Sequence, residues 1–366
     1  MKEFNHKFSR SKQPNRILVA PLHWGLGHAT RCIPLIRELR RAGHEVILAS
    51  DGGALQLLKK EFPQLECVEL PSYDIEYSRK GSLFKLKLFI NLPHIRKTIK
   101  KERKVVKTLV KEGKIDGIIS DNRLGVFSKK VPSVFITHQL NVLSGNTSWL
   151  SSKAHQKVMR KFDECWVPDI EGPGNLSGKL GHLKKPSFAI KYMGLLSRME
   201  PQELPIRYDI LCLLSGPEPQ RSMLEDKLIK ELVPTGKKIL LVRGVVEDKS
   251  RSEVDINLTT VNFLTSEALE KAIDESELIV ARSGYTTIMD LAALNKKAFF
   301  IPTPGQYEQE YLAQRLKNQS LVPSCKQDDF SNEKLEEIPD YKGLSGYKTN
   351  QNLQSLFYLF EREREL

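Results

Sequence analysis

The chain has 366 residues, 40% hydrophobic and 8% aromatic, a composition that excludes a disordered protein and allows two domains with full cores. Its net charge is +12, and its five cysteines stand singly, which argues against a zinc site and indicates reduced thiols in a cytoplasm-like compartment. Residues 1–16 contain no apolar run, and no apolar stretch reaches the ~18 residues of a membrane span. We therefore expect no signal peptide, no transmembrane helix and a soluble or peripheral protein.

Short apolar runs alternate with helical stretches along the first half of the chain. A helix is expected from about Thr30 to Arg41, where Gly43 ends it, and a basic helix over residues 95–110. Strands separated by helices form parallel sheets with helices on both faces. The expected strands are residues 17–20, 44–49, 67–70, 117–120, 133–137 and 164–167.

A second set of strands begins after a stretch with two prolines and little periodicity, which we interpret as a linker over residues 195–207. The last expected helix runs from about Asn350 to Glu363 and carries an apolar stripe. The predicted fold class is therefore α/β, with two Rossmann-like parallel-sheet domains. The expected strands of the second set are residues 210–214, 238–242, 260–263, 278–281 and 298–301.

Most of the excess positive charge lies in residues 79–114, which contain thirteen Lys or Arg and two acids. Aromatic and apolar residues alternate with lysines in residues 83–90. Such a segment can bind an anionic membrane surface or a lipid-linked acceptor, it can bind nucleic acid, or it can simply be a solvated helix face. No recognisable nucleic-acid module accompanies it, so we do not expect a nucleic-acid partner.

The turn in residues 281–290 joins an apolar strand to a helix. Gly284 lies at the bend, and Thr286 and Thr287 follow in the first helical turn. A helix N-terminus presents unpaired backbone N–H groups and the positive end of the helix dipole, which suit a phosphate. One turn later, Asp290 can accept hydrogen bonds from ribose hydroxyls. The alternative is an ordinary strand–helix turn without a ligand.

The first strand is followed by a glycine-rich loop in residues 23–31. Gly25 and Gly27 allow a close approach of ligand to backbone, and His28 lies at the start of a helix. A dinucleotide fingerprint requires a third glycine, but Thr30 stands there, so cofactor binding is not indicated. A helix N-terminus disfavours imidazolium, so we expect His28 to be neutral near pH 7 and able to accept a proton. The alternative is a capping histidine.

Together with residues 302–313, the 281–290 turn resembles the donor half of the GT-B glycosyltransferases, more narrowly family 28. The resemblance extends from Ile17 to about Gln319 and implies two Rossmann-like domains facing each other across a cleft. It places His28 at the position of the catalytic base, beside an acceptor-side loop. The implied organisation is an acceptor-side domain over residues 1–194, a linker, a nucleotide-sugar domain over residues 208–345, and a C-terminal helix in residues 346–366 that crosses back to the first domain.

The resemblance also implies a set of donor-binding residues. Ser215, Gly216 and Arg221 match the family's phosphate loop, although Pro217 and Pro219 remove two N–H donors from it and shift the expected phosphate contacts towards the 281–290 turn. Other positions match the segments that contact the nucleobase, the diphosphate and the sugar hydroxyls. The full donor set is Arg198, Ser215, Gly216, Arg221, Leu264, Ser283, Gly284, Thr286, Thr287, Asp290, Glu308 and Gln309.

Acceptor-side residues are expected at the ends of strands in the first domain, where open α/β sheets bind ligands. His138 and Asn141 match the outer positions of the family's H-E-Q-N segment, whereas Gln139 and Leu140 depart from the inner pair. Each of these polar residues can instead stabilise a turn. The full acceptor set is Gly25, Gly27, Asp121, Arg123, His138 and Asn141.

Two absent motifs bear on the mechanism. No Asp-x-Asp motif is present, so we expect neither a GT-A enzyme nor a metal site or other cofactor besides the UDP-sugar donor. Retaining GT-B enzymes carry a pair of glutamates that ends at the position of Asp290, but Arg282 stands at the earlier position. We therefore expect an inverting, metal-independent glycosyltransferase acting on a lipid-linked or other glycan acceptor.

Two alternatives fit the same residues. One is a nucleotide-sugar hydrolase or epimerase of the same fold. The other is a non-catalytic protein that binds a nucleotide sugar or RNA, which the two prolines in the phosphate loop favour. The best-known member of family 28 is the peptidoglycan N-acetylglucosaminyltransferase that makes lipid II, and the departures in this loop and in residues 138–141 argue against that enzyme itself. A cytoplasmic location, with attachment to the inner face of the cell membrane through residues 79–114, is the expectation that the resemblance supports.

Overall fold

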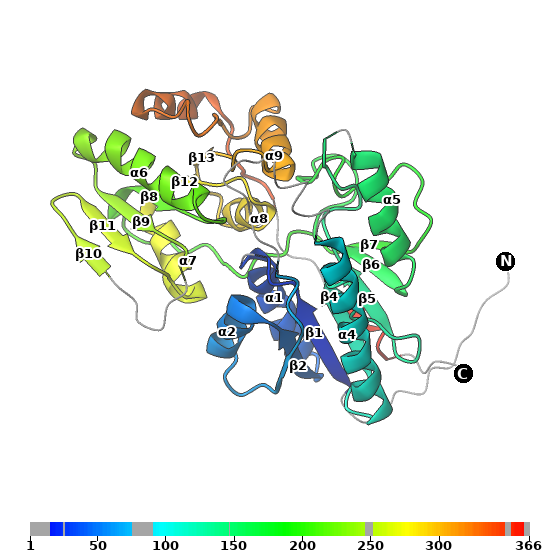
Figure 1. Cartoon of the computed structure of the whole chain (residues 1–366). Helices are drawn as coiled ribbons and strands as arrows, with labels where there is room; N and C mark the ends of the chain where they lie inside the picture. Colours follow the sequence, from blue (N-terminus) through cyan, green and yellow to red (C-terminus); the bar gives the residue numbers. More distant parts are fainter. Residues whose placement is uncertain are drawn as a thin grey trace.

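The structure of the chain is a computed structural model that describes residues 15–24, 26–74, 91–145, 147–245, 252–347 and 353–361. Two sheets flanked by helices make up most of it, and each sheet belongs to one half of the chain (Figure 1). The predicted α/β fold of two Rossmann-like parallel-sheet domains is confirmed.

The first sheet has seven parallel strands in the order β3-β2-β1-β4-β5-β6-β7. The chain order reverses between β1 and β4, and ligands of open α/β sheets bind beyond the carboxyl ends of the strands at such a point. Both strands are fully or almost fully buried, which explains their continuous apolar runs. The strands are β1 (Arg16–Pro21), β2 (Glu45–Ser50), β3 (Cys67–Glu69), β4 (Gly117–Asp121), β5 (Ser133–Ile136), β6 (Glu164–Val167) and β7 (Ile190–Tyr192).

The second sheet has six strands in the order β10-β11-β9-β8-β12-β13, of which only the edge strand β10 runs antiparallel. Its order reverses between β8 and β12, so the loops that follow these strands lie at the switch point. The strands are β8 (Tyr208–Leu213), β9 (Ile239–Val242), β10 (Ser252–Val254), β11 (Leu258–Val261), β12 (Ser276–Ala281) and β13 (Ala298–Phe300).

Helices connect the parallel strands in both halves. The helices of the first half are α1 (Gly27–Arg41), α2 (Gly52–Glu61), α4 (Leu92–Lys111) and α5 (Ser148–Met159). Those of the second half are α6 (Gln220–Leu232), η1 (Val233–Thr235), α7 (Ser266–Asp274), α8 (Tyr285–Ala293), α9 (Tyr307–Asn318), η2 (Asn332–Asp340) and α10 (Gln354–Phe357).

Helices α1 and α8 pack against each other where the two halves meet (Figure 1). Helix α1 buries Ala29, Ile33 and Ile36 at helical spacing, and α8 buries Ile288 and Met289 in the same apolar cluster. Burial of such side chains contributes about 1.5–3 kcal/mol each. This packing brings the N-termini of α1 and α8 together.

The last described residues return to the first sheet. The Nδ2 atom of Asn15 donates a hydrogen bond of 2.9 Å to the carbonyl of Phe360, and the Trp166 ring of β6 lies 6.4 Å from Phe357 and 6.1 Å from Phe360. Within the described residues 353–361, helix α10 spans only Gln354–Phe357. The other residues of the expected helix are outside the described part of the chain.

Several strands differ from their expected positions, and β8 and β12 each begin two residues earlier than expected. Strands β7 and β10 were not expected, since three residues are too few for a recognisable alternation. Strand β11 begins two residues earlier than expected, because its register follows Ile239–Val242 of β9 rather than its own apolar residues. Edge strands pair by backbone hydrogen bonds, so their limits depend on a neighbour and not on a side-chain pattern.

Candidate active site

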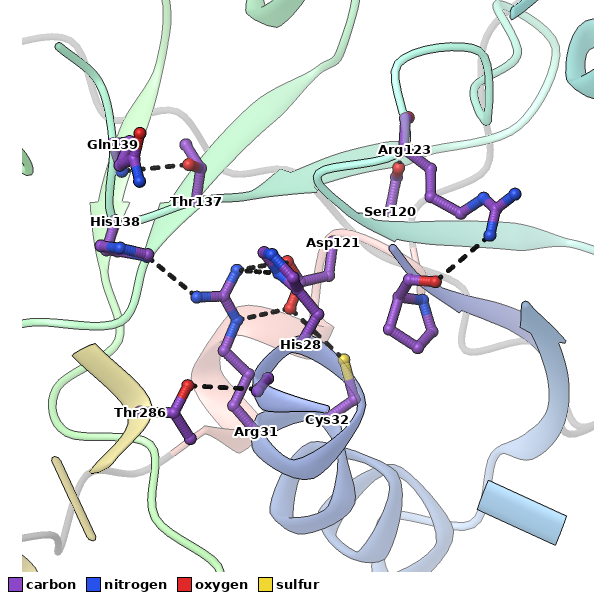
Figure 2. A network of polar contacts seen from close by, with 12 residues as sticks. His28, Arg31, Cys32, Ser120, Asp121, Arg123, Thr137, His138, Gln139 and Thr286 are labelled. Carbon is purple, nitrogen blue, oxygen red and sulfur yellow. Dashed lines mark hydrogen bonds and ion pairs between the residues drawn. The ribbon is translucent and has the colours of Figure 1, made fainter. Parts of the chain in front are cut away.

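His28 and Asp121 lie together at the carboxyl edge of the first sheet. His28 is the second residue of α1, and Asp121 is the last residue of β4. The Nδ1 atom of His28 lies 2.8 Å from Oδ1 of Asp121, and Figure 2 shows the two side chains directed towards each other. Asp121 is fully buried, whereas the His28 side chain is 15% exposed. The pair therefore presents its histidine, and not its carboxylate, to solvent.

A buried arginine, Arg31, completes this cluster. Its Nε and Nη2 atoms donate to both oxygens of the Asp121 carboxylate, a bidentate ion pair (Figure 2). Its Nη2 atom also lies 2.9 Å from Nδ1 of His28. Arg31 is one turn after His28 on α1, so the two side chains project from the same face of the helix. Arg31 was not predicted as a site residue, although its spacing from His28 was a usable signal.

The charges of the cluster follow from these contacts. Burial lowers the pKa of His28 below its usual 6.5, and Arg31 lowers it further, against the opposing effect of Asp121. Burial would raise the pKa of Asp121, but the charges and hydrogen bonds of Arg31 and His28 hold it well below its ordinary range. Burial raises the pKa of the Cys32 thiol, which lies 3.6 Å from Asp121. Asp121 is thus ionised, and His28 is mostly neutral at pH 7.

The ionised Asp121 also determines the tautomer of His28. The ionised Asp121 only accepts hydrogen bonds, so Nδ1 of His28 carries the proton and donates to Oδ1. Arg31 Nη2 donates to the same oxygen, so its 2.9 Å approach to Nδ1 is a contact and not a hydrogen bond. The lone pair is then on Nε2, which has no hydrogen-bond partner within the described residues. A neutral imidazole with an unengaged Nε2 can act as a general base.

His138 joins the cluster to the second half of the chain. Its Nδ1 atom lies 2.9 Å from Nη1 of Arg31, and its Nε2 atom lies 2.6 Å from Oε1 of Glu308, the second residue of α9. Its ring stacks on Tyr285 of α8 with 4.5 Å between the ring centroids. Gln139 donates to the other oxygen of Glu308. The carboxyl edges of the two sheets therefore meet at His138 and Glu308.

Two further hydrogen bonds join the halves beside this cluster. The hydroxyl of Thr286 donates to the carbonyl of Gly27 at 3.2 Å, and the hydroxyl of Tyr285 donates to the carbonyl of Pro168 at 3.0 Å. A Cβ atom on Gly27 would lie 3.1 Å from the Thr286 hydroxyl, so the close approach of α1 and α8 favours glycine there. Gly27 thus lies at the junction of the halves, and Gly25 is outside the described residues.

Two predicted donor residues hold the loop after β13. The Ser283 hydroxyl is fully buried and donates to the carbonyl of Gln309 at 2.9 Å. The side-chain oxygen of Gln309 accepts a hydrogen bond of 2.8 Å from the backbone N–H of Thr303. Neither side chain is open to a ligand in this arrangement, because each is occupied in shaping the loop. Gly284 at the N-cap of α8 and the half-buried Thr287 remain accessible.

Arg282, which stands where retaining enzymes carry a glutamate, is buried beside the start of α6. It is 1% exposed, and its guanidinium donates to the carbonyls of Ile301, Pro302 and Gln220 and to the side chain of Gln327. Burial lowers its pKa to about 10. Through these hydrogen bonds, Arg282 links the loop after β13 to the start of α6.

The loop between β8 and α6 leaves its predicted phosphate contacts exposed. Ser215 and Gly216 are exposed, and Gly216 has a φ of +97°, a conformation that favours glycine. Arg221 instead points to Glu218 and forms an ion pair with it, while its Nη1 donates to the carbonyl of Arg243 at 3.3 Å. Arg221 is thus engaged within its own loop and helix.

Asp290 faces the linker. Its Oδ1 atom accepts a hydrogen bond of 2.7 Å from the Ser197 hydroxyl, and Arg198 lies close enough to lower its pKa. Burial outweighs these contacts and raises the pKa of Asp290 to about 6. The Nε atom of Arg198 is buried without a partner among the described residues. Leu264 is half-buried against the large apolar cluster that contains α1 and α8.

Two predicted acceptor residues stabilise loops instead of lining the cluster. Arg123 is fully buried and donates to Glu102 at 2.7 Å, to Asp51 at 2.6 Å and to the carbonyl of Pro71 at 2.7 Å. These bonds direct it away from His28, as Figure 2 shows. Asn141 donates to the carbonyl of Lys179 at 2.6 Å. The alternative of a turn-stabilising role fits both side chains.

The fold and relatives of the chain identify its class. The glycosyltransferase VinC, solved in complex with DTDP, superposes with a TM-score of 0.60 over 95% of this chain and all of that one, at 14% identity. The glycosyltransferase family 28 C-terminal domain matches residues 222–340. The chain is a GT-B glycosyltransferase. This assignment confirms the resemblance that the turn in residues 281–290 and its neighbours indicated.

The relatives of this glycosyltransferase extend over both halves. An uncharacterised glycosyltransferase of Methanosarcina mazei is 26% identical over 78% of this chain and 79% of its own length. The UDP-N-acetylglucosamine–N-acetylmuramyl-(pentapeptide) pyrophosphoryl-undecaprenol N-acetylglucosamine transferase of Actinobacillus pleuropneumoniae is 22% identical over 84% of each chain. MurG of Acinetobacter baumannii superposes with a TM-score of 0.54 over 95% of this chain and 99% of its own, at 16% identity.

Proposed function

We propose that this glycosyltransferase inverts the anomeric centre of a UDP-sugar donor, with His28 as the general base. Nε2 of His28 takes the proton of an acceptor hydroxyl, the hydroxyl oxygen attacks the anomeric carbon, and the bond from that carbon to the diphosphate oxygen breaks. The products are the glycosylated acceptor and UDP. The observation that carries this proposal is the hydrogen bond from Nδ1 of His28 to the buried Asp121, which leaves Nε2 as the basic atom.

The leaving diphosphate needs positive charge, which we assign to backbone and not to a metal ion. The exposed Ser215 and Gly216 lie just before α6, and Gly284 begins α8, so both helix N-termini can present N–H groups to phosphate. The absence of an Asp-x-Asp motif supports metal-independent transfer. Preorganised N–H donors of this kind typically contribute about 2.7–4 kcal/mol each to lowering the barrier.

A donor panel tests this function. The full chain is incubated with UDP- and dTDP-sugars, with and without lipid-linked and soluble glycan acceptors, and the released nucleotide and the product's anomeric configuration are measured. We expect release of UDP that depends on the acceptor and a product of inverted configuration. Equal release of free sugar without an acceptor would favour the hydrolase alternative, and a product with retained configuration would contradict the proposed mechanism.

Asp290 is proposed to accept hydrogen bonds from the donor ribose once the ligand displaces Ser197. We predict that Asp290→Ala weakens UDP binding by about 10- to 100-fold, because hydrogen bonds to a charged group contribute about 1.5–3 kcal/mol. Since the pKa of Asp290 is about 6, binding to the wild type should also weaken as pH falls below this value. Titration calorimetry measures both effects, with the exposed Glu267→Ala as control. Wild-type affinity in Asp290→Ala would remove Asp290 from the donor site.

The exposed face of α4 supports attachment to an anionic membrane. The one acid within the helix, Glu102, is fully buried, so the exposed charges of α4 are all positive. Each surface Lys or Arg contributes ~1 kcal/mol near an anionic bilayer. No helix among the described residues is long and apolar enough to span a bilayer. Residues 79–90, the other part of the predicted segment, are outside the described residues.

Vesicle flotation tests this attachment. We predict that the chain floats with anionic vesicles at low salt, is released as salt screens the charges, and fails to float when Lys97, Lys100, Lys101 and Lys104 become glutamate. A matched control makes the same charge change elsewhere, at the exposed Lys184, Lys185, Lys237 and Lys238. Equal flotation with neutral and anionic vesicles, or equal loss in the control, would leave α4 as a solvated face and favour a soluble glycan acceptor.

A further inference from the structure

Three groups next to Asp121 can balance or share its buried charge. The carboxylate contacts Arg31 through both oxygens, His28 through Oδ1 and the Cys32 thiol through Oδ2. One negative charge needs one positive charge nearby, since an unpaired buried ion is strongly unfavourable. A guanidinium remains protonated at any pH that proteins tolerate, whereas an imidazole does not. Arg31 therefore supplies the balancing charge, so the buried carboxylate does not require a protonated His28.

The position of Arg31 further disfavours protonation of His28. Its Nη2 atom lies 2.9 Å from Nδ1 of His28, so the fixed charge of the guanidinium repels the positive charge that the ring would carry after taking up a second proton. Its Nη1 atom lies 2.9 Å from Nδ1 of His138. Arginine has no acceptor atom, so Nδ1 of His138 must accept this bond and its Nε2 must carry the proton that Glu308 receives at 2.6 Å. One guanidinium thus determines the protonation of two histidines.

We propose that Arg31 is a positioning residue that keeps His28 an unprotonated base and selects the Nε2-protonated tautomer of His138. The proposal rests on the proposed role of His28 as general base. Arg31 itself does not reach the substrate, because it is 2% exposed and its donors are directed to Asp121 and His138. It acts through the two rings that it contacts.

The protonation of His28 depends on the charged and titratable groups around its ring. Asp121 acts on it from β4, Arg31 from α1, His138 from the loop after β5 and Glu308 from α9. Cys32 of α1 contacts Asp121. Without Arg31, the two carboxylates of Asp121 and Glu308 face two histidines and, among the residues that the structure describes, no permanent cation. His28 should then take up a proton near neutral pH and lose the lone pair that a base needs.

The test follows the histidines directly by NMR in the ligand-free full chain, labelled with ¹⁵N and ¹³C at histidine, from about pH 5 to pH 9. In the wild type we expect His28 neutral and Nδ1-protonated at pH 7, and His138 Nε2-protonated. In Arg31→Met the titration midpoint of His28 should rise by roughly one to three pH units. Arg31→Lys should keep the midpoint low, since it retains the charge, but lose the tautomer of His138, since it lacks the fork of donors.

Arg37→Met is the matched control on the same helix, since Arg37 is 43% exposed and lies 3.6 Å from Glu61. It should leave both histidines unchanged. An unchanged midpoint in a folded Arg31→Met, or an Nδ1-protonated His138 in the wild type, would overturn the proposal. If Arg31→Met fails to fold, the wild-type tautomers and Arg31→Lys still decide it. Transfer activity that survives His28→Ala would instead overturn the base assignment and leave these NMR results intact.

Discussion

Replacement of His28 by alanine is expected to slow sugar transfer by about 10²–10⁴-fold, the usual contribution of a general base. Donor affinity should stay at the wild-type level, because His28 belongs to the first half of the chain and the proposed donor site to the second. Initial rates at saturating donor and acceptor, together with calorimetry for UDP, measure the two effects. His94→Ala on α4, whose ring contacts Ser72 and Asp74, is the matched control. Near-wild-type turnover in His28→Ala would show that another group accepts the proton.

The pH profile gives an independent measurement of the same base. Because the pKa of His28 lies below 6.5, the ring is neutral and active above that value and becomes inactive as pH falls through its pKa. We therefore expect kcat/KM to be level from about pH 7 to pH 8 and to decline on the acid side. Arg31→Met should move the acid limb to higher pH, in line with the role proposed for Arg31. An acid limb at the same pH in Arg31→Met and in the wild type would show that Arg31 does not control the protonation of His28.

Replacement of Arg123 by methionine should destabilise the fold more than any exposed substitution, by about 3–5 kcal/mol, because it leaves buried acids without their cation. Glu102 is fully buried and Asp51 nearly so, and both accept hydrogen bonds from Arg123. The free energy of unfolding from urea denaturation measures the loss. Arg96→Met on the exposed face of α4 is the control, with an expected change within about 0.5 kcal/mol. Equal stability of the two variants would contradict the structural role of Arg123.

The loss in Arg123→Met should also depend on pH. Burial raises the pKa of Glu102, an effect that Arg123 opposes, so removing Arg123 raises it further. When the pKa of a carboxyl group is raised in the folded state, the folded chain keeps its stability while the group is protonated. The free energy of unfolding falls as pH rises towards and through that pKa. The variant should therefore lose more stability at pH 8 than at pH 5. A loss that is the same at both values would indicate that packing, and not charge, explains the effect.

Much of the architecture was predictable because it depends on local patterns. Buried parallel strands such as β1 and β4 have continuous apolar runs, and α1 ends at Arg41, two residues before Gly43, so the sequence pattern alone indicates them. The glycosyltransferase class was also recognisable, because the turn in residues 281–290 and its following segments form a contiguous motif. The secondary-structure elements and the enzyme class are both recognisable because the residues that indicate them are neighbours in the sequence.

The roles of individual polar residues depended on the tertiary structure. Asp121 and Arg123 stand two positions apart, yet one contacts His28 and the other is buried with Glu102, because the chain turns sharply at Asn122, which has a φ of +59°. Arg31 and His138 are 107 positions apart and meet only through the pairing of β4 with β5 and the packing of α1. A sequence identifies which residues can ionise or donate. Which of these residues form ion pairs or hydrogen bonds with one another depends on the distances between them, and only the folded chain determines those distances.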